Sequence, residues 1–95
     1  MIPVKIYTTS YCAYCYAAKR LLSRRGYPFH EIDVENDAAL RARIAKSVGN
    51  YRTVPMIFIG DEFIGGYDEL AYLDRSGRLE PKLTTELQPP KAATR

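Results

Sequence analysis

Two cysteines, Cys12 and Cys15, are the feature that most constrains what this chain can fold into. They are the only cysteines in its 95 residues. They follow a strand-like apolar run, Val4–Thr8, and open a helix-like run over residues 13–25. A thiol in the first turn of a helix lies near backbone N–H groups that have no helical partner and near the positive end of the helix dipole, and both favour the thiolate. The pair therefore predicts thiol chemistry at the start of a helix.

The spacing of the pair suits a disulfide that opens and closes. Two residues three apart on a helix have Cβ atoms roughly 5–6 Å apart. A disulfide needs roughly 3.5–4.5 Å between these atoms. We therefore expect Cys12 and Cys15 to cycle between dithiol and disulfide with only a small local adjustment of the chain.

The rest of the chain alternates between strand-like and helix-like patterns. Strands are expected at residues 3–8, 29–34, 56–59 and 62–65, and helices at residues 11–25, 38–48 and 69–75. The first two strands, joined by a helix, should be parallel. The last two should form a hairpin whose turn is Gly60-Asp61, and Asp68 is expected to cap the third helix. This order predicts an α/β fold with a four-stranded mixed sheet flanked by three or more helices.

Length and composition limit the function further. We expect one domain over residues 1–84 and a flexible tail over residues 85–95. The N-terminus lacks a signal-peptide layout and no apolar run could span a bilayer, so we expect a cytoplasmic protein away from the membrane. A net charge of +3 is too modest to argue for nucleic acid, and no aromatic-basic pattern supports it, so we expect no nucleic-acid partner. In a reducing compartment a close cysteine pair is catalytic or metal-binding, but a zinc site needs four ligands and His30 is the only other soft one.

Further motifs follow the cysteine pair along the chain. Thr53-Val54-Pro55 precedes a buried strand, and Gly65-Gly66-Tyr67-Asp68 precedes the last expected helix. Together with Cys12-Ala13-Tyr14-Cys15, these motifs resemble the glutaredoxin family, and the small bacterial dithiol type most closely, over residues 4–83. The resemblance implies the thioredoxin fold. It also implies a glutathione-dependent thiol–disulfide oxidoreductase, which reduces protein disulfides and glutathione mixed disulfides.

The resemblance also implies roles for individual residues. Cys12 would be the nucleophile and Cys15 the resolving thiol. The implied glutathione-binding residues are Tyr14, Arg52, Thr53, Val54, Pro55, Gly66, Tyr67 and Asp68. The Val54–Pro55 bond is expected to be cis, and Arg52 would meet the glycyl carboxylate. A γ-glutamyl carboxylate at a helix N-terminus also makes physical sense, because the dipole favours an anion there. Glutathione and disulfide-bearing or glutathionylated proteins are the implied partners of a monomer.

Two positions depart from the family pattern. Ala13 stands where the commonest dithiol motif has proline, and Thr9 stands where many members have lysine, which removes a cation near Cys12. Because proline disfavours cluster binding, Ala13 leaves open an alternative function. In this alternative function, a [2Fe–2S] cluster is bridged by Cys12 of two chains and by two glutathiones, and the chain is then a dimer. Otherwise we expect no metal. A third possibility, reduction by thioredoxin reductase, ranks last, because the chain lacks tryptophan and the tail motif of that group.

Overall fold

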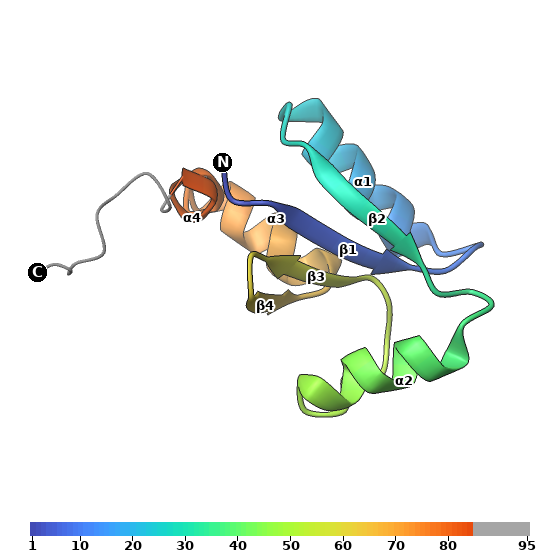
Figure 1. Cartoon of the computed structure of the whole chain (residues 1–95). Coiled ribbons are helices and arrows are strands. Elements are labelled where there is room, and N and C mark those ends of the chain that lie inside the picture. The colour runs from blue at the N-terminus through green and yellow to red at the C-terminus, as the bar shows by residue number, and fades with distance from the viewer. Residues whose placement is uncertain (85–95) are drawn as a thin grey trace, which may run out of the picture.

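The computed structural model describes residues 1–84, and the predicted tail at residues 85–95 lies outside the described residues. The strands are β1 (Val4–Thr8), β2 (Phe29–Asp33), β3 (Met56–Ile59) and β4 (Glu62–Gly65). The helices are α1 (Ala13–Arg24), α2 (Ala38–Ser47), α3 (Tyr67–Arg75) and α4 (Leu79–Thr84). Figure 1 shows the helices arranged around the sheet. The predicted α/β class is confirmed.

The four strands form one mixed sheet in the order β2-β1-β3-β4. β1 runs parallel to β2, with Val4 opposite Phe29, and antiparallel to β3, with Val4 opposite Ile59. β3 and β4 pair as the expected hairpin. This arrangement is the predicted sheet and the thioredoxin fold. It brings the C-terminal end of β1, which leads to the cysteines, beside the N-terminal end of β3, which follows the Thr53-Val54-Pro55 motif.

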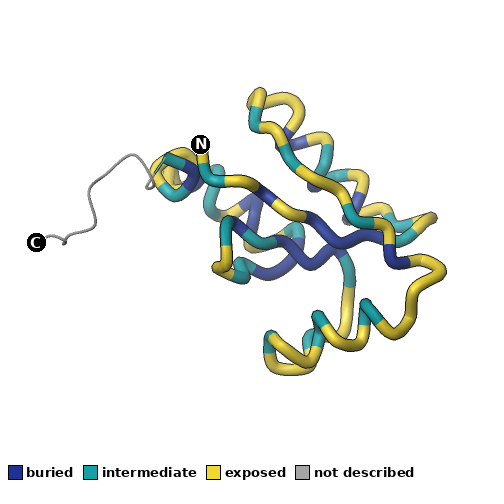
Figure 2. The backbone as a smooth tube through the Cα atoms, viewed as in Figure 1, coloured by how far each residue is buried: buried dark blue, intermediate teal, exposed yellow. Residues whose placement is uncertain are grey.

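Apolar side chains pack on both faces of the sheet, and the buried backbone runs through its centre (Figure 2). On one face α1, α3 and α4 cover β1 and β3 with residues that include Leu22, Leu70 and Leu83, each fully buried. Burying one such side chain contributes roughly 1.5–3 kcal/mol. On the other face α2 packs only partly buried residues against a cluster around Tyr7 and Met56. The helices on this first face, which include α1 with the cysteines, are therefore more deeply anchored than α2.

Most elements end within one or two residues of the predicted positions, and the larger differences concern the caps of α1 and α3 and the presence of α4. α1 begins at Ala13, and Cys12 is its N-cap in an extended conformation, so Cys12 is not in the first helical turn. The prediction that Asp68 caps α3 is wrong, because Gly66 is the N-cap and the Glu69 side chain folds back to accept its N–H. α4 was not predicted as a helix. It forms because Leu79 and Leu83 bury completely against the core.

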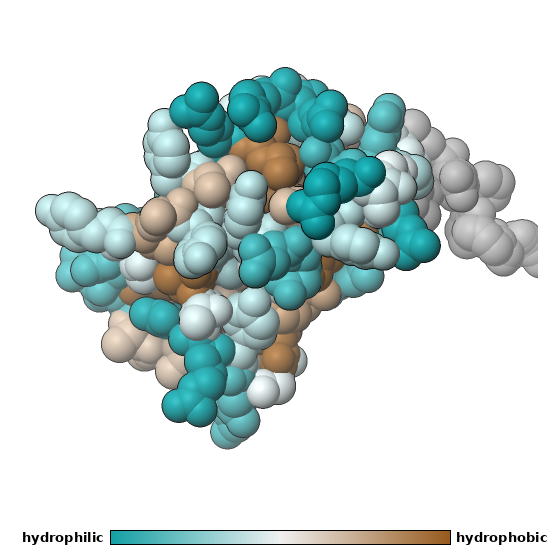
Figure 3. Space-filling model, turned by 180° about the vertical axis from the view of Figure 1, so that it is seen from behind, coloured by the Kyte–Doolittle hydropathy of each residue, from teal (hydrophilic) through white to brown (hydrophobic). Residues whose placement is uncertain are grey.

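On the face shown in Figure 3, hydrophobic residues occur as small patches between hydrophilic ones. No helix within residues 1–84 is long and apolar enough to cross a membrane.

Candidate active site

The local backbone places Cys12 at the start of α1. Tyr11 adopts a left-handed conformation with φ of 56°, which turns the chain between β1 and α1. Cys12 then takes an extended conformation, and its Sγ accepts a hydrogen bond of 3.0 Å from the Cys15 backbone N–H. A sulfur at this position lies at the positive end of the helix dipole, which favours an anion. The same Sγ lies 3.7 Å from the Val54 carbonyl oxygen.

Cys15 is the buried member of the pair. Its side chain is only 2% exposed, whereas Cys12 is partly exposed, and both thiols are free. Burial raises the pKa of Cys15 to about 12, and a hydrogen bond with Cys12 adds to the rise. The Thr9 backbone N–H acts in the opposite direction. The two sulfurs are therefore unequal: an accessible one that can react first, and a protonated one held behind it.

A polar network lies beside Cys15. The buried Thr8 hydroxyl donates to Glu31 Oε2 at 2.7 Å, and Lys19 Nζ donates to the same oxygen at 2.9 Å. The Thr8 hydrogen bond and then the Lys19 ammonium hold the pKa of Glu31 below its usual range. Lys19, Glu31 and both cysteines line one open hollow. The positive charge of Lys19 also lowers the pKa of Cys15, against the larger effect of burial.

A second hollow lies on the other side of the Cys12–Val54 contact, with a volume of about 240 Å³. It is lined by Tyr14, Tyr51, Thr53, Val54, Pro55, Gly66, Tyr67, Asp68 and Glu69. The Val54–Pro55 peptide bond is cis, as expected. The exposed ring of Tyr14 lies 6.3 Å from that of Tyr67 between centroids. The fold thus brings three motifs that are distant in the sequence to one place.

The N-terminus of α3 closes one end of this second hollow. Its first helical hydrogen bond runs from the Leu70 N–H to the Gly66 carbonyl oxygen. The N–H groups of Tyr67, Asp68 and Glu69 precede that bond and have no partner in the helix. Such groups, with the helix dipole behind them, favour a carboxylate or phosphate. The Asp68 carboxylate beside them would favour a ligand that also carries a cation.

Most of the residues that the sequence predicts for glutathione binding lie together, and one does not. Arg52 is exposed and does not line the hollow. Its carbonyl oxygen accepts a 3.4 Å hydrogen bond from Arg41 Nη2. Two lining residues, Tyr51 and Glu69, were not among the predicted ones. For Glu69 the sequence did hold a signal, since a Glu three residues after an N-cap commonly reaches back to it. For Tyr51 the only signal was its place two residues before Thr53.

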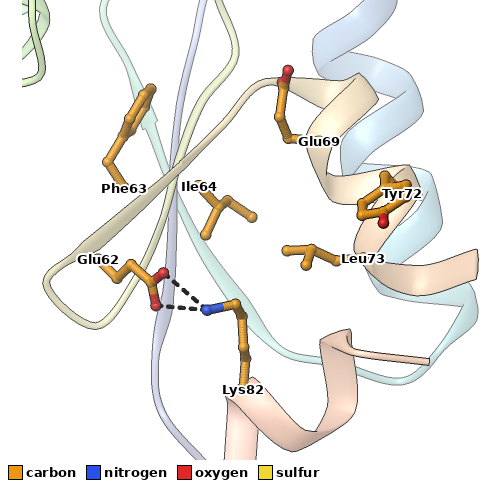
Figure 4. Close-up of a pocket in the computed structure, with 7 residues that line it drawn as sticks. All are labelled: Glu62, Phe63, Ile64, Glu69, Tyr72, Leu73 and Lys82. Atoms are coloured by element: carbon orange, nitrogen blue, oxygen red, sulfur yellow. Dashed lines mark hydrogen bonds and ion pairs between the residues drawn. The ribbon is translucent and has the colours of Figure 1, made fainter. Parts of the chain in front are cut away.

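A third hollow lies away from the cysteines, between β4, α3 and α4 (Figure 4). Ile64 faces Leu73 and Tyr72 there, and Lys82 bonds both carboxylate oxygens of Glu62 at 2.9 Å. It contains no thiol, and only Glu69 is shared with the second hollow. Within residues 1–84, no group of three or more His, Cys, Asp and Glu side chains is arranged to hold a metal ion.

The fold and the paired thiols define a thiol oxidoreductase with the thioredoxin fold. The glutaredoxin family model matches residues 4–64. A glutaredoxin of Pseudomonas aeruginosa is 46% identical over 84 residues, which cover 88% of this chain and 99% of the relative. Glutaredoxin 3 of Escherichia coli K12 is 46% identical over 83 residues, 87% and 99% of the two chains. The chain belongs to the glutaredoxin family.

Solved structures agree with this assignment. The solution structure of glutaredoxin from Brucella melitensis superposes with a TM-score of 0.80 at 43% identity, and the match covers 90% of this chain and 92% of that one. The crystal structure of a buckwheat glutaredoxin–glutathione complex superposes with a TM-score of 0.82 at 33% identity, covering 88% and 78%.

Proposed function

We propose that this chain is a glutathione-dependent oxidoreductase that reduces glutathione mixed disulfides and protein disulfides, with Cys12 as nucleophile and Cys15 as resolving thiol. The observation that carries the proposal is the 3.7 Å contact of Cys12 Sγ with the Val54 carbonyl oxygen. This contact puts the accessible sulfur beside Val54, a residue that lines the second hollow, where a peptide could pair with the backbone. A related chain, the buckwheat protein, was solved as a glutathione complex, which supports glutathione as the occupant.

Glutathione would lie along the second hollow. Its cysteinyl backbone would pair with the backbone of Val54, and Tyr14 would pack on the tripeptide. Its γ-glutamyl carboxylate would meet the N–H groups at the start of α3, and Asp68 would pair with the free α-ammonium group. Arg52 would reach the glycyl carboxylate from outside the hollow. Thr53, Pro55, Gly66 and Tyr67 would shape the walls.

With a glutathione mixed disulfide, one thiol is sufficient. The Cys12 thiolate attacks the glutathione sulfur, a Cys12–glutathione disulfide forms, and the substrate leaves as a thiolate that takes a proton from water. The thiolate of a second glutathione then attacks the sulfur of the bound glutathione. Glutathione disulfide leaves and the Cys12 thiolate returns, so one free glutathione thiol is consumed for each substrate thiol released, and the disulfide bond passes from the substrate to glutathione. The N-cap hydrogen bond from the Cys15 N–H supports Cys12 as attacking and as leaving thiolate.

With a protein disulfide, Cys15 completes the reaction. Cys12 first forms a mixed disulfide with one substrate sulfur, and the other substrate sulfur leaves as a thiolate. Cys15 then attacks Cys12 Sγ, the Cys12–Cys15 disulfide forms, and the second substrate sulfur leaves. Cys15 must lose its proton to do this. Part of the rise in its pKa comes from the hydrogen bond and charge of Cys12. That part disappears once Cys12 is in a disulfide, so Cys15 becomes easier to deprotonate when it is needed.

The test is turnover of a small glutathione mixed disulfide, coupled to glutathione reductase and NADPH, for wild type, Cys12→Ser and Cys15→Ser. Wild type and Cys15→Ser should be active and Cys12→Ser inactive. With a protein disulfide, Cys15→Ser should stop at the mixed disulfide with Cys12. An inactive wild type would refute glutathione dependence. Cluster bridging through Cys12 stays a prediction, and a protein that is colourless after reconstitution with iron, sulfide and glutathione would contradict it.

A further inference from the structure

Tyr51 lines the proposed glutathione hollow without a role in the reaction described above. It precedes the Arg52-Thr53 pair and lies in the connection between α2 and β3. Its ring is partly buried and stacks edge-on against Phe63, with the centroids 4.9 Å apart. It also packs on the apolar cluster around Tyr7 and Met56. These contacts fix the ring, and therefore also fix where the hydroxyl points.

The hydroxyl of Tyr51 lies against the N-cap of α3. A Cβ atom placed on Gly66 would lie 3.0 Å from the Tyr51 hydroxyl oxygen and 3.4 Å from the Pro55 carbonyl oxygen. Gly66 itself has a φ of −107°, which any residue can adopt. The absence of a side chain at Gly66 is therefore explained by the approach of Tyr51 and not by backbone conformation.

We propose that the Tyr51 hydroxyl donates a hydrogen bond to the α-carboxylate of the γ-glutamyl group of glutathione, and so helps to select ligands that carry this carboxylate. A carboxylate has about four acceptor sites on its two oxygens. The backbone N–H groups at the start of α3 can fill only some of them. A hydroxyl that lies beside Gly66 is placed to fill another. The inference rests on the proposed function.

The Glu69 side chain also contributes to the selection of the ligand. Its Oε1 accepts the Gly66 N–H at 2.8 Å and its carboxylate faces the same hollow. The Gly66 N–H is therefore already occupied and is not free for a ligand. Its occupation makes an additional donor, such as the Tyr51 hydroxyl, more valuable to an incoming carboxylate. The Glu69 charge would also repel an anion that lacks the compensating α-ammonium group.

The test compares Tyr51→Phe with wild type on two substrates. One is the mixed disulfide of glutathione with a small thiol. The other is the same compound made with γ-aminobutyryl-cysteinylglycine, which lacks the α-carboxylate. Tyr51→Phe should raise KM for the glutathione substrate about tenfold, which is the usual effect of losing a hydrogen bond to a charged group. Its kcat should stay near the wild-type value, because the carboxylate binds alike in ground and transition states. For the truncated substrate, the two proteins should have the same KM.

Matched variants separate a hydroxyl effect from a structural one. Tyr72→Phe removes an exposed hydroxyl from the hollow in Figure 4 and should change neither KM. Gly66→Ala should raise KM in the wild-type background and much less in the Tyr51→Phe background, because the colliding hydroxyl is then gone. An unchanged KM for Tyr51→Phe, or an equal rise for both substrates, would overturn the inference. Wild type without activity on the glutathione substrate would instead refute the proposed function.

Discussion

Gly65 offers a sharp test of how the loop before α3 is built. Its φ is +111°, and a Cβ atom there would lie 2.8 to 2.9 Å from three side-chain atoms of Glu69. The change Gly65→Ala therefore has two costs. The backbone strain is on the order of 1–3 kcal/mol. Glu69 must also move and release the Gly66 N–H, and that partly buried hydrogen bond contributes about 1–2 kcal/mol. We expect a total loss of about 2–5 kcal/mol, a large fraction of the roughly 5–15 kcal/mol that stabilises a domain.

Gly26→Ala is the matched control. Gly26 has a φ of +76° at the end of α1, and a Cβ atom there would meet nothing within 4 Å. Left-handed alanine costs about 1–2 kcal/mol, and the stiffer unfolded chain offsets about 0.4–1 kcal/mol of it, so the net loss should be about 1 kcal/mol.

The assay for both glycine changes is urea unfolding followed by circular dichroism, because the chain has no tryptophan. Combining Gly65→Ala with Glu69→Ala should cost about 1–2 kcal/mol less than the sum of the two single changes, since the collision and the lost hydrogen bond are then counted once. Equal losses for Gly65→Ala and Gly26→Ala, or strict additivity with Glu69→Ala, would refute the role assigned to Glu69.

Two further predictions concern pH. Because the folded pKa of Glu31 lies below its unfolded value of about 4.3, its contribution to stability is present above that value and is lost as pH falls through the folded pKa. The difference in unfolding free energy between wild type and Glu31→Gln should therefore shrink in acid, and a constant difference would contradict the network with Thr8 and Lys19. Cys15 has the opposite sign, since a folded pKa of about 12 means that the native state keeps a proton which the unfolded chain releases above about pH 8.5. Stability of the reduced protein should fall with pH from there upward, and Cys15→Ser should flatten this slope in alkaline urea titrations.

The sheet could be predicted from the sequence because its signals are local. The strands at Met56–Ile59 and Glu62–Gly65 have the predicted bounds. A continuous apolar run flanked by Pro55 and the Gly60-Asp61 turn leaves little choice of start or end. α4 could not be predicted in the same way. It is only six residues long and contains Pro81, and helices of that length depend on tertiary packing. Complete burial of Leu79 and Leu83 supplies that packing.

The ends of the helices near the site were harder to predict, for a chemical reason. The usual N-cap residues are Ser, Thr, Asp and Asn, and Asp37 caps α2 in this way. α1 and α3 are instead capped by Cys12 and Gly66, which are residues of the site itself. Asp68 is the residue that general preference selects for α3, and it lies two residues after the N-cap in the first turn, exposed and placed to meet a ligand. A capping rule therefore gives the wrong residue where the helix end is also the proposed binding site.

The N-cap position of Cys12 connects the reactivity of the two sulfurs. Because Cys12 Sγ accepts the Cys15 N–H, any negative charge on Cys12 is stabilised by the start of α1. The same charge raises the pKa of Cys15, through a hydrogen bond and through repulsion. The pair thus favours one thiolate at a time, and in the free reduced protein burial keeps the proton on Cys15. Once Cys12 is in a disulfide, it carries no charge and only burial still raises the pKa of Cys15. The pKa of Cys15 is therefore lower at the step in which Cys15 must act as the nucleophile.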